Sequence, residues 1–225
     1  MSTLKLYSAP SCPFAQRTRL LMAEKSLDYA LEEIDLTNKP DWFYRISPAG
    51  KVPCLVHDGV TLLESAVINE YLNEAFPTPD FLPGGPARRA QARYWIARTD
   101  QRLIPAFYRL LMAQTPDLRM SQRDHFQAAL AELATAYQGP YFLGKQPTLM
   151  DFALYPFFER LAMLDFYRQA ALPPGAECLR DWHHTLLGQA SVQALLQPTA
   201  FYIQYYSRYA DGSADGVTAR EMREA

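Results

Sequence analysis

Short apolar runs alternate with amphipathic stretches in the first third of the chain. Residues 4–7 are apolar except for Lys5 and predict a short buried strand, whereas beyond Pro13 the apolar positions recur at helical spacing. An imperfect alternation over residues 27–34 indicates a second strand. Because a helix joins these two strands, we expect them to lie parallel with a right-handed crossover.

The stretch that follows predicts a hairpin and a further helix. Asp58-Gly59 separates the apolar residues 52–57 from residues 60–63, which is a strong signal for a β-hairpin. Ser65 is of the type that caps helix N-termini, so the next helix is expected to start there. This order of elements predicts a small α/β domain over residues 1–77.

The remainder of the chain has helical patterns. Residues 78–86 are rich in proline and glycine and predict a linker. An all-helical domain is predicted over residues 87–208, and Pro105 should kink its first long helix. The small, polar residues 209–225 predict a disordered tail. The predicted helices span residues 87–114, 122–137, 149–167, 176–187 and 191–206.

Composition limits the class of protein. The 225 residues are 49% hydrophobic and 13% aromatic, enough for a well-packed core. A formal net charge of -2 points to no polyanionic partner, so nucleic acid is not expected. Neither a signal segment nor an apolar run long enough to span a bilayer is found, so no membrane partner is expected. The three widely spaced cysteines argue for a reducing compartment, and we expect a cytoplasmic protein.

Cys12 carries the strongest chemical signal. It lies between the first strand and the first helix, directly before Pro13, which is well tolerated at the first helical position. The free N–H groups and the dipole at that helix end favour negative charge, so we expect a lowered thiol pKa and a reactive thiolate. The residue three places on is Ala15, so redox chemistry at Cys12 needs a thiol from elsewhere. The alternative is a buried, inert cysteine.

Two further features gain meaning beside a reactive cysteine. Pro53 cannot donate to a strand ladder, so the Val52-Pro53 bond is either trans at a strand edge, or cis with the backbone groups of Val52 free for a ligand. Glu64 and Ser65 at a helix start would match the ammonium and carboxylate groups of an α-amino acid. The alternatives are an ordinary surface carboxylate and a purely structural cap.

Together these motifs resemble the glutathione transferase superfamily, and its omega class most. The likeness extends to about Tyr206. It implies a thioredoxin-like N-terminal domain and an all-α C-terminal domain, usually in a homodimer, and no metal. The similar stretches are Cys-Pro-Phe-Ala-Gln-Arg-Thr-Arg-Leu at residues 12–20, Asn-Lys-Pro-Asp-Trp-Phe at 38–43, Lys-Val-Pro at 51–53, Glu-Ser-Ala at 64–66, Met-Asp at 150–151 and Phe-Glu-Arg-Leu at 158–161.

The resemblance also implies a glutathione site on the N-terminal domain, with Cys12 as the catalytic residue. The cysteinyl backbone of glutathione would pair with Val52, held outward by a cis Pro53, and its γ-glutamyl end would meet Glu64 and Ser65. Two residues that carry no signal alone complete the set: Lys39 would reach the glycyl carboxylate, and Phe14 would line the thiol site.

A cysteine at this position implies a thioltransferase and dehydroascorbate reductase that works through a Cys12–glutathione mixed disulfide, rather than a conjugating enzyme. One alternative is a regulator that binds RNA polymerase without enzymatic activity. The stringent starvation proteins resemble the chain at Glu64-Ser65 and at residues 139–143, but lack the cysteine motif. The other alternative is a glutathione-dependent lyase acting on small aromatic substrates.

Overall fold

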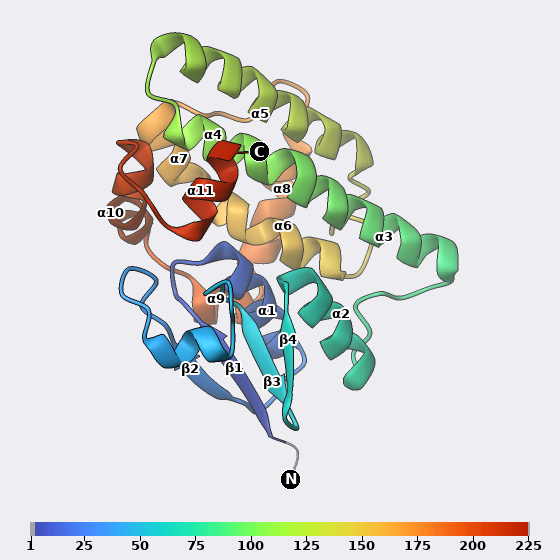
Figure 1. Cartoon of the computed structure of the whole chain (residues 1–225). Coiled ribbons are helices and arrows are strands. Elements are labelled where there is room, and N and C mark those ends of the chain that lie inside the picture. Colours follow the sequence, from blue (N-terminus) through green and yellow to red (C-terminus); the bar gives the residue numbers. More distant parts are fainter. Residues whose placement is uncertain (1–2, 225) are drawn as a thin grey trace.

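A computed structural model describes residues 3–224, in which a sheet domain lies against a larger helical domain (Figure 1). The four-stranded sheet has the order β2-β1-β3-β4. β2 pairs parallel to β1, as predicted, and β3 pairs antiparallel with both β1 and β4. The strands are β1 (Leu4–Ser8), β2 (Ala30–Glu33), β3 (Cys54–His57) and β4 (Val60–Leu63).

Local sequence accounts for this sheet. Leu6 of β1 and Leu55 of β3 pair across the centre of the sheet and are fully buried. In the hairpin turn Asp58 and Gly59 have positive φ angles of 48° and 83°, which suits the twist of a two-residue hairpin. A short 3-10 helix, η1 (Asp41–Arg45), lies between β2 and β3.

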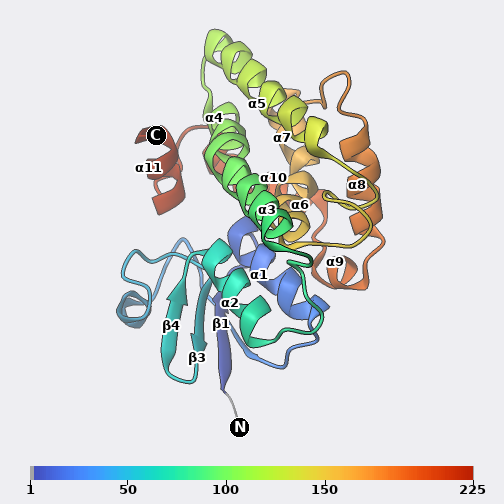
Figure 2. The ribbon, with the colours of Figure 1, turned by 90° about the vertical axis from the view of Figure 1, so that its right-hand side faces the viewer.

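Helices α1 (Pro13–Glu24) and α2 (Ser65–Ala75) cover the face of the sheet that meets the helical domain (Figure 2). They pack on each other, and α1 also packs on α6. The remaining helices are α3 (Pro86–Arg98), α4 (Ile104–Met112), α5 (Pro116–Ala136), α6 (Leu149–Glu159), α7 (Leu161–Arg168), α8 (Cys178–Leu187), α9 (Ala190–Leu195), α10 (Thr199–Ala210) and α11 (Val217–Glu224).

Two predicted helices differ from the observed ones. The stretch predicted over residues 87–114 contains a π-helical segment, Thr99–Leu103, immediately before the helix that holds Pro105. A wider turn there accommodates the ring that would clash with a carbonyl in the preceding turn. The stretch predicted over residues 149–167 breaks at Arg160, which separates α6 from α7.

The tail predicted to be disordered carries a helix instead. In α11, Ala219 is fully buried and Met222 packs against the core. The helix contacts α4. Composition indicated disorder because the segment is small and polar, but tertiary packing decides whether such a short helix forms.

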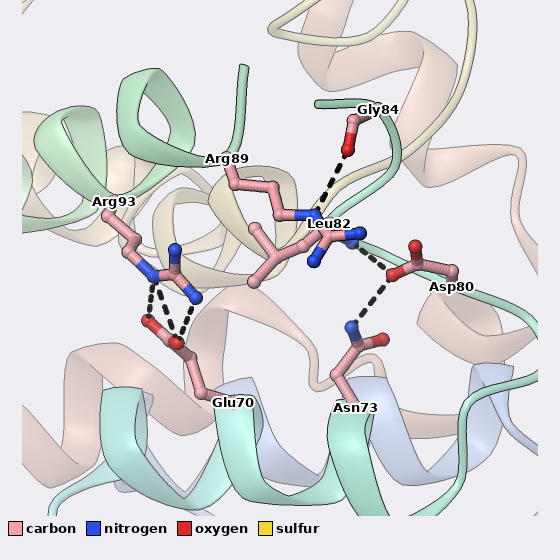
Figure 3. A network of polar contacts seen from close by, with 7 residues as sticks. All are labelled: Glu70, Asn73, Asp80, Leu82, Gly84, Arg89 and Arg93. Atoms are coloured by element: carbon pink, nitrogen blue, oxygen red, sulfur yellow. Dashed lines mark hydrogen bonds and ion pairs between the residues drawn. The ribbon is translucent and has the colours of Figure 1, made fainter. Parts of the chain in front are cut away.

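Arg93 of α3 ties the helical domain to α2, while Arg89 of the same helix donates to the carbonyl oxygen of Gly84 in the linker (Figure 3). Arg93 makes a bidentate pair with Glu70, with Nη2–Oε2 and Nε–Oε1 distances of 2.8 and 3.0 Å. In the linker, Asp80 accepts hydrogen bonds from the side chain of Asn73 and the backbone of Leu82, both at 2.8 Å. None of the helices in residues 3–224 has the length and apolar character needed to cross a bilayer.

Candidate active site

A cavity of about 350 Å³ opens between the sheet domain and the C-terminal part of the chain. The sheet domain forms one wall, from the start of α1, the loops on either side of η1 and the junction between β4 and α2. Residues of α10 and residues 214–222 form the opposite wall. The residues predicted for the site all line this cavity: Cys12, Phe14, Lys39, Val52, Pro53, Glu64 and Ser65.

Cys12 occupies the N-cap position of α1, as predicted from its place before Pro13. Its side chain is partly buried, and its Sγ lies 3.5 Å from the carbonyl oxygen of Val52, to which the thiol donates. The backbone N–H groups of Phe14 and Ala15 interact with the sulfur from the first turn of the helix. The sulfur is thus held between a helix N-terminus and the segment that leads into β3.

Burial raises the pKa of the Cys12 thiol, which corrects the lowered value expected from the sequence. The N–H groups of Phe14 and Ala15 and the guanidinium groups of Arg160 and Arg17 lower it, but they do not outweigh the loss of water around the sulfur. The helix end is visible in the local sequence, whereas the desolvation of Cys12 is not, because residues distant in the chain cover the sulfur. Burial therefore opposes ionisation of the Cys12 thiol.

Arg17 is buried behind this part of the site, with 1% of its surface exposed. It donates to the carbonyl oxygen of Ala153 and to Oδ1 of Asp100, both at 2.7 Å, and to Oγ of Ser65 at 3.4 Å. One guanidinium group thereby connects α1, the start of α2 and the π-helical segment. Its charge also lies close enough to Cys12 to favour the thiolate.

Arg160, at the break between α6 and α7, is fully buried on the other side of the first turn of α1. It donates to Oε1 of Gln16 and to the carbonyl oxygen of Pro156, both at 2.6 Å, and to that of Ser11 at 3.1 Å. Sequence reasoning assigned no role to Arg17 or Arg160. The only signal was that both lie in the stretches that resemble the family.

The Val52-Pro53 peptide bond is cis, as the resemblance implied. Val52 and Pro53 are both buried, while the carbonyl oxygen of Val52 faces the thiol of Cys12. The main chain of the segment before β3 therefore contacts the sulfur of Cys12 directly.

Glu64, rather than Ser65, is the N-cap residue of α2, so the predicted cap was one residue too late. Ser65 is the first helical residue and its hydroxyl accepts from Arg17. Glu64 adopts φ 67° and ψ 115°, a conformation that costs a non-glycine residue energy and is often found at functional sites. The strained residue presents an exposed carboxylate at the cavity, directly before a helix N-terminus.

Lys39 is the cation on this wall without a carboxylate partner among the described residues. Burial and the neighbouring charge of Arg220 lower its pKa, and Cys12 acts in the opposite direction. A partly buried lysine with no counterion is suited to an anionic group of a ligand.

The opposite wall contains residues that were not assigned to the site from the sequence. Tyr205, Arg208 and Tyr209 of α10 line the cavity, as do Glu221 and Met222 of α11. No sequence motif marks these residues. Glu221 and Met222 lie on a helix that was predicted to be disordered. Phe107 and Tyr108 of α4 and Tyr202 and Tyr206 of α10 are instead buried in the core. In the described part of the chain, no three His, Cys, Asp or Glu residues gather as metal ligands would.

Comparisons with known proteins give the same division of the chain. Residues 11–75 match the model of the glutathione S-transferase N-terminal domain, and residues 86–184 match that of the glutathione S-transferase C-terminal domain. The chain therefore belongs to the glutathione S-transferase family. The fold is that of the family, as predicted: a thioredoxin-like sheet domain followed by a helical domain.

The relatives include omega-class proteins. Glutathione S-transferase omega-1 of Sus scrofa is 32% identical over 197 residues, which cover 85% of this chain and 80% of the relative. Pyrimidodiazepine synthase of Drosophila melanogaster is 34% identical over 169 residues, 73% of this chain and 68% of the relative. The crystal structure of glutathione transferase Omega 3C from Trametes versicolor superposes with a TM-score of 0.86 at 30% identity, covering 99% of this chain and 92% of that one. This chain is an omega-class homologue.

Proposed function

We propose that the protein is a glutathione-dependent thioltransferase and dehydroascorbate reductase in which Cys12 forms a mixed disulfide with glutathione. The observation that carries the proposal is the position of Cys12 at a helix N-terminus in the same cavity as Val52, Glu64 and Ser65. Family membership supports glutathione as the thiol that Cys12 needs, because α1 supplies no second cysteine.

The wall formed by the sheet domain offers matched partners for a γ-glutamyl tripeptide. Glu64 would accept from the ammonium group, and the N-terminus of α2 at Ser65 would bind the adjacent carboxylate. The backbone of Val52 would pair with the cysteinyl residue. Lys39 would pair with the glycyl carboxylate, and Phe14 would pack beside the sulfur.

In the proposed reaction the Cys12 thiolate attacks the glutathionyl sulfur of a mixed disulfide. The bond between that sulfur and the acceptor sulfur breaks, and the acceptor leaves as a thiolate that takes up a proton. A second glutathione thiolate then attacks the glutathionyl sulfur held on Cys12. This step releases oxidised glutathione and restores the Cys12 thiolate.

Two positive charges support the reactive form of Cys12 against its burial. Arg17 and Arg160 are held rigidly by hydrogen bonds, and both favour the thiolate. Because the pKa of Cys12 is nevertheless raised, only a small fraction is ionised at neutral pH, and we expect the activity to rise with pH. That expectation separates this mechanism from one that relies on a fully ionised resting thiolate.

Assays with three acceptors test the proposal: hydroxyethyl disulfide and dehydroascorbate, each with glutathione, beside chlorodinitrobenzene as the conjugation control. We expect reduction of the first two and weak conjugation. A strong conjugation rate without disulfide reduction would overturn the proposal. Absence of glutathione binding would favour a regulator of the stringent starvation type. Assembly as a homodimer, which the family resemblance implies, and a cytoplasmic location, which the cysteine pattern indicates, remain predictions.

A further inference from the structure

The wall opposite Cys12 is a separate segment of chain that folds back over the sheet domain. Figure 2 shows α11 beside α4, above the segment between β2 and β3 and outside the main helical bundle. Its inner side brings Val217, Thr218, Glu221 and Met222 to the cavity, and Ala214 and Gly216 of the preceding loop also line it. The segment formed by residues 214–224 is called the C-terminal flap below.

Charged groups fix the flap at both ends. Lys51, on the wall of the sheet domain, pairs with Glu221 of α11 with an Nζ–Oε1 distance of 2.6 Å. Arg208 of α10 pairs with Asp215 at 3.2 Å. Arg223 donates to the carbonyl oxygens of Gly212 at 2.9 Å and Ala214 at 2.6 Å, which closes the loop on itself. Among the ion pairs of residues 3–224, the Lys51–Glu221 pair joins the wall of the sheet domain to the flap.

The flap leaves little room in the site. The cavity volume of about 350 Å³ lies at the small end of the range of about 300–1,000 Å³ that is usual for small-molecule sites. Cys12 and the residues expected to hold glutathione face the same cavity as the flap. A tripeptide and a small acceptor would share this space, whereas a disulfide on a folded protein would reach Cys12 only after movement of the flap.

We propose that the C-terminal flap is a size filter that restricts the enzyme to small disulfides and excludes glutathionylated proteins, and that the Lys51–Glu221 ion pair holds it closed. The acceptor preference rests on the proposed function, but the closure itself is a property of the fold. Both partners are partly exposed, with side-chain exposures of 38% for Lys51 and 47% for Glu221, so the pair is modest in strength and weakened by salt.

The test uses Glu221→Lys, which places two like charges where the ion pair stands. The chain offers a matched control in the Lys5–Glu32 pair between β1 and β2, which has a distance of 2.8 Å and side-chain exposures of 38% and 41%. Neither Lys5 nor Glu32 lines the cavity. Glu32→Lys therefore introduces the same charge change at the same kind of pair without touching the flap. A chain that ends at Gly216 and lacks α11 is the second test variant.

The first readout does not require catalysis. It compares the alkylation of Cys12 by N-ethylmaleimide with that by a maleimide carrying a polyethylene glycol chain, with peptide mapping to separate Cys12 from Cys54 and Cys178. In Glu221→Lys we expect the rate with the large reagent, relative to the small one, to rise about two- to fivefold, as breaking one exposed ion pair allows. The chain that ends at Gly216 should show a larger rise, and Glu32→Lys none.

The second readout compares glutathione removal from glutathionylated serum albumin with reduction of hydroxyethyl disulfide. The rate with albumin relative to that with hydroxyethyl disulfide should rise most in the chain that ends at Gly216 and less in Glu221→Lys. It should not change in Glu32→Lys. An unchanged size preference in both Glu221→Lys and the shortened chain would overturn the filter. If the unmodified protein reduces no disulfide at all, the proposed function fails, but the maleimide comparison still decides whether the flap closes the site.

Discussion

The two walls of the cavity differ in how they are built. The wall of the sheet domain combines helix N-termini, the cis Val52-Pro53 segment and Glu64 with its positive φ angle, all within the first third of the chain. The opposite wall comes from α10 and the C-terminal flap, and exposed ion pairs join the flap to the sheet domain and to α10. We infer that the first wall is rigid and determines the thiol chemistry and glutathione binding, whereas the second is adaptable and determines the acceptor.

The largest expected effect is the loss of activity when Cys12, on the wall of the sheet domain, is replaced. Cys12→Ala should lower thioltransferase activity on the order of 10³-fold or more, because it removes the nucleophile. Glutathione binding, measured by calorimetry, should persist. Cys178→Ala is the matched control, because Cys178 does not line the cavity, and it should behave as the unmodified protein. Full activity in Cys12→Ala would refute the role of this sulfur.

The dependence on pH is the next largest effect. Because burial raises the pKa of Cys12, its alkylation rate should increase about tenfold per pH unit from pH 7 upward, as the thiolate fraction grows. The rise should continue beyond the pH at which free glutathione, alkylated in parallel, reaches its plateau. A plateau for Cys12 at a lower pH than for glutathione would mean that the helix end and the two arginines outweigh burial.

Removing the charge of Glu64 should weaken glutathione binding and leave the chemistry intact. For Glu64→Gln we expect about a tenfold increase in the KM for glutathione, the usual cost of losing a hydrogen bond to a charged group, with little change in kcat. Glu70→Gln on the same helix is the control, because Glu70 pairs with Arg93 and does not line the cavity. Equal effects of the two variants would indicate that the site was assigned to the wrong end of α2.

The smallest effect is expected at Lys39. Lys39→Met should raise the KM for glutathione about three- to fivefold and flatten its dependence on salt, because a partly screened charge pair is lost. Steady-state assays over a range of ionic strength measure both quantities. Lys145→Met removes an exposed lysine that does not line the cavity and should change neither.

The same comparison explains how much the sequence could predict. The Asp58-Gly59 hairpin, the parallel β1–β2 pair and the position of Cys12 follow from local signals that lie within a few residues of the feature. The fold class followed from motifs of the same kind. The predicted N-cap of α2, Ser65, lies one residue after the observed one, Glu64. The residue type at position 65 gives no information on the backbone angles of Glu64, which make it the cap.

Contacts between distant segments account for what the sequence did not predict. At the helix break, the guanidinium of Arg160 donates hydrogen bonds to Gln16 and Ser11, which are far away in the chain. The raised pKa of Cys12 comes from the burial of its own sulfur. Likewise α11 looks like a polar tail until Ala219 is placed against the helical domain. Short-range patterns carry no information on such contacts.

The most direct measurement is the mass of the intact protein after incubation with a mixed disulfide of glutathione and a small thiol, in the absence of free glutathione. Cys12 should gain one glutathionyl group within a single turnover, and subsequent addition of glutathione should remove it. Peptide mapping should find the group on Cys12 and not on Cys54 or Cys178. Turnover by a protein that never carries this adduct would contradict the mixed-disulfide mechanism.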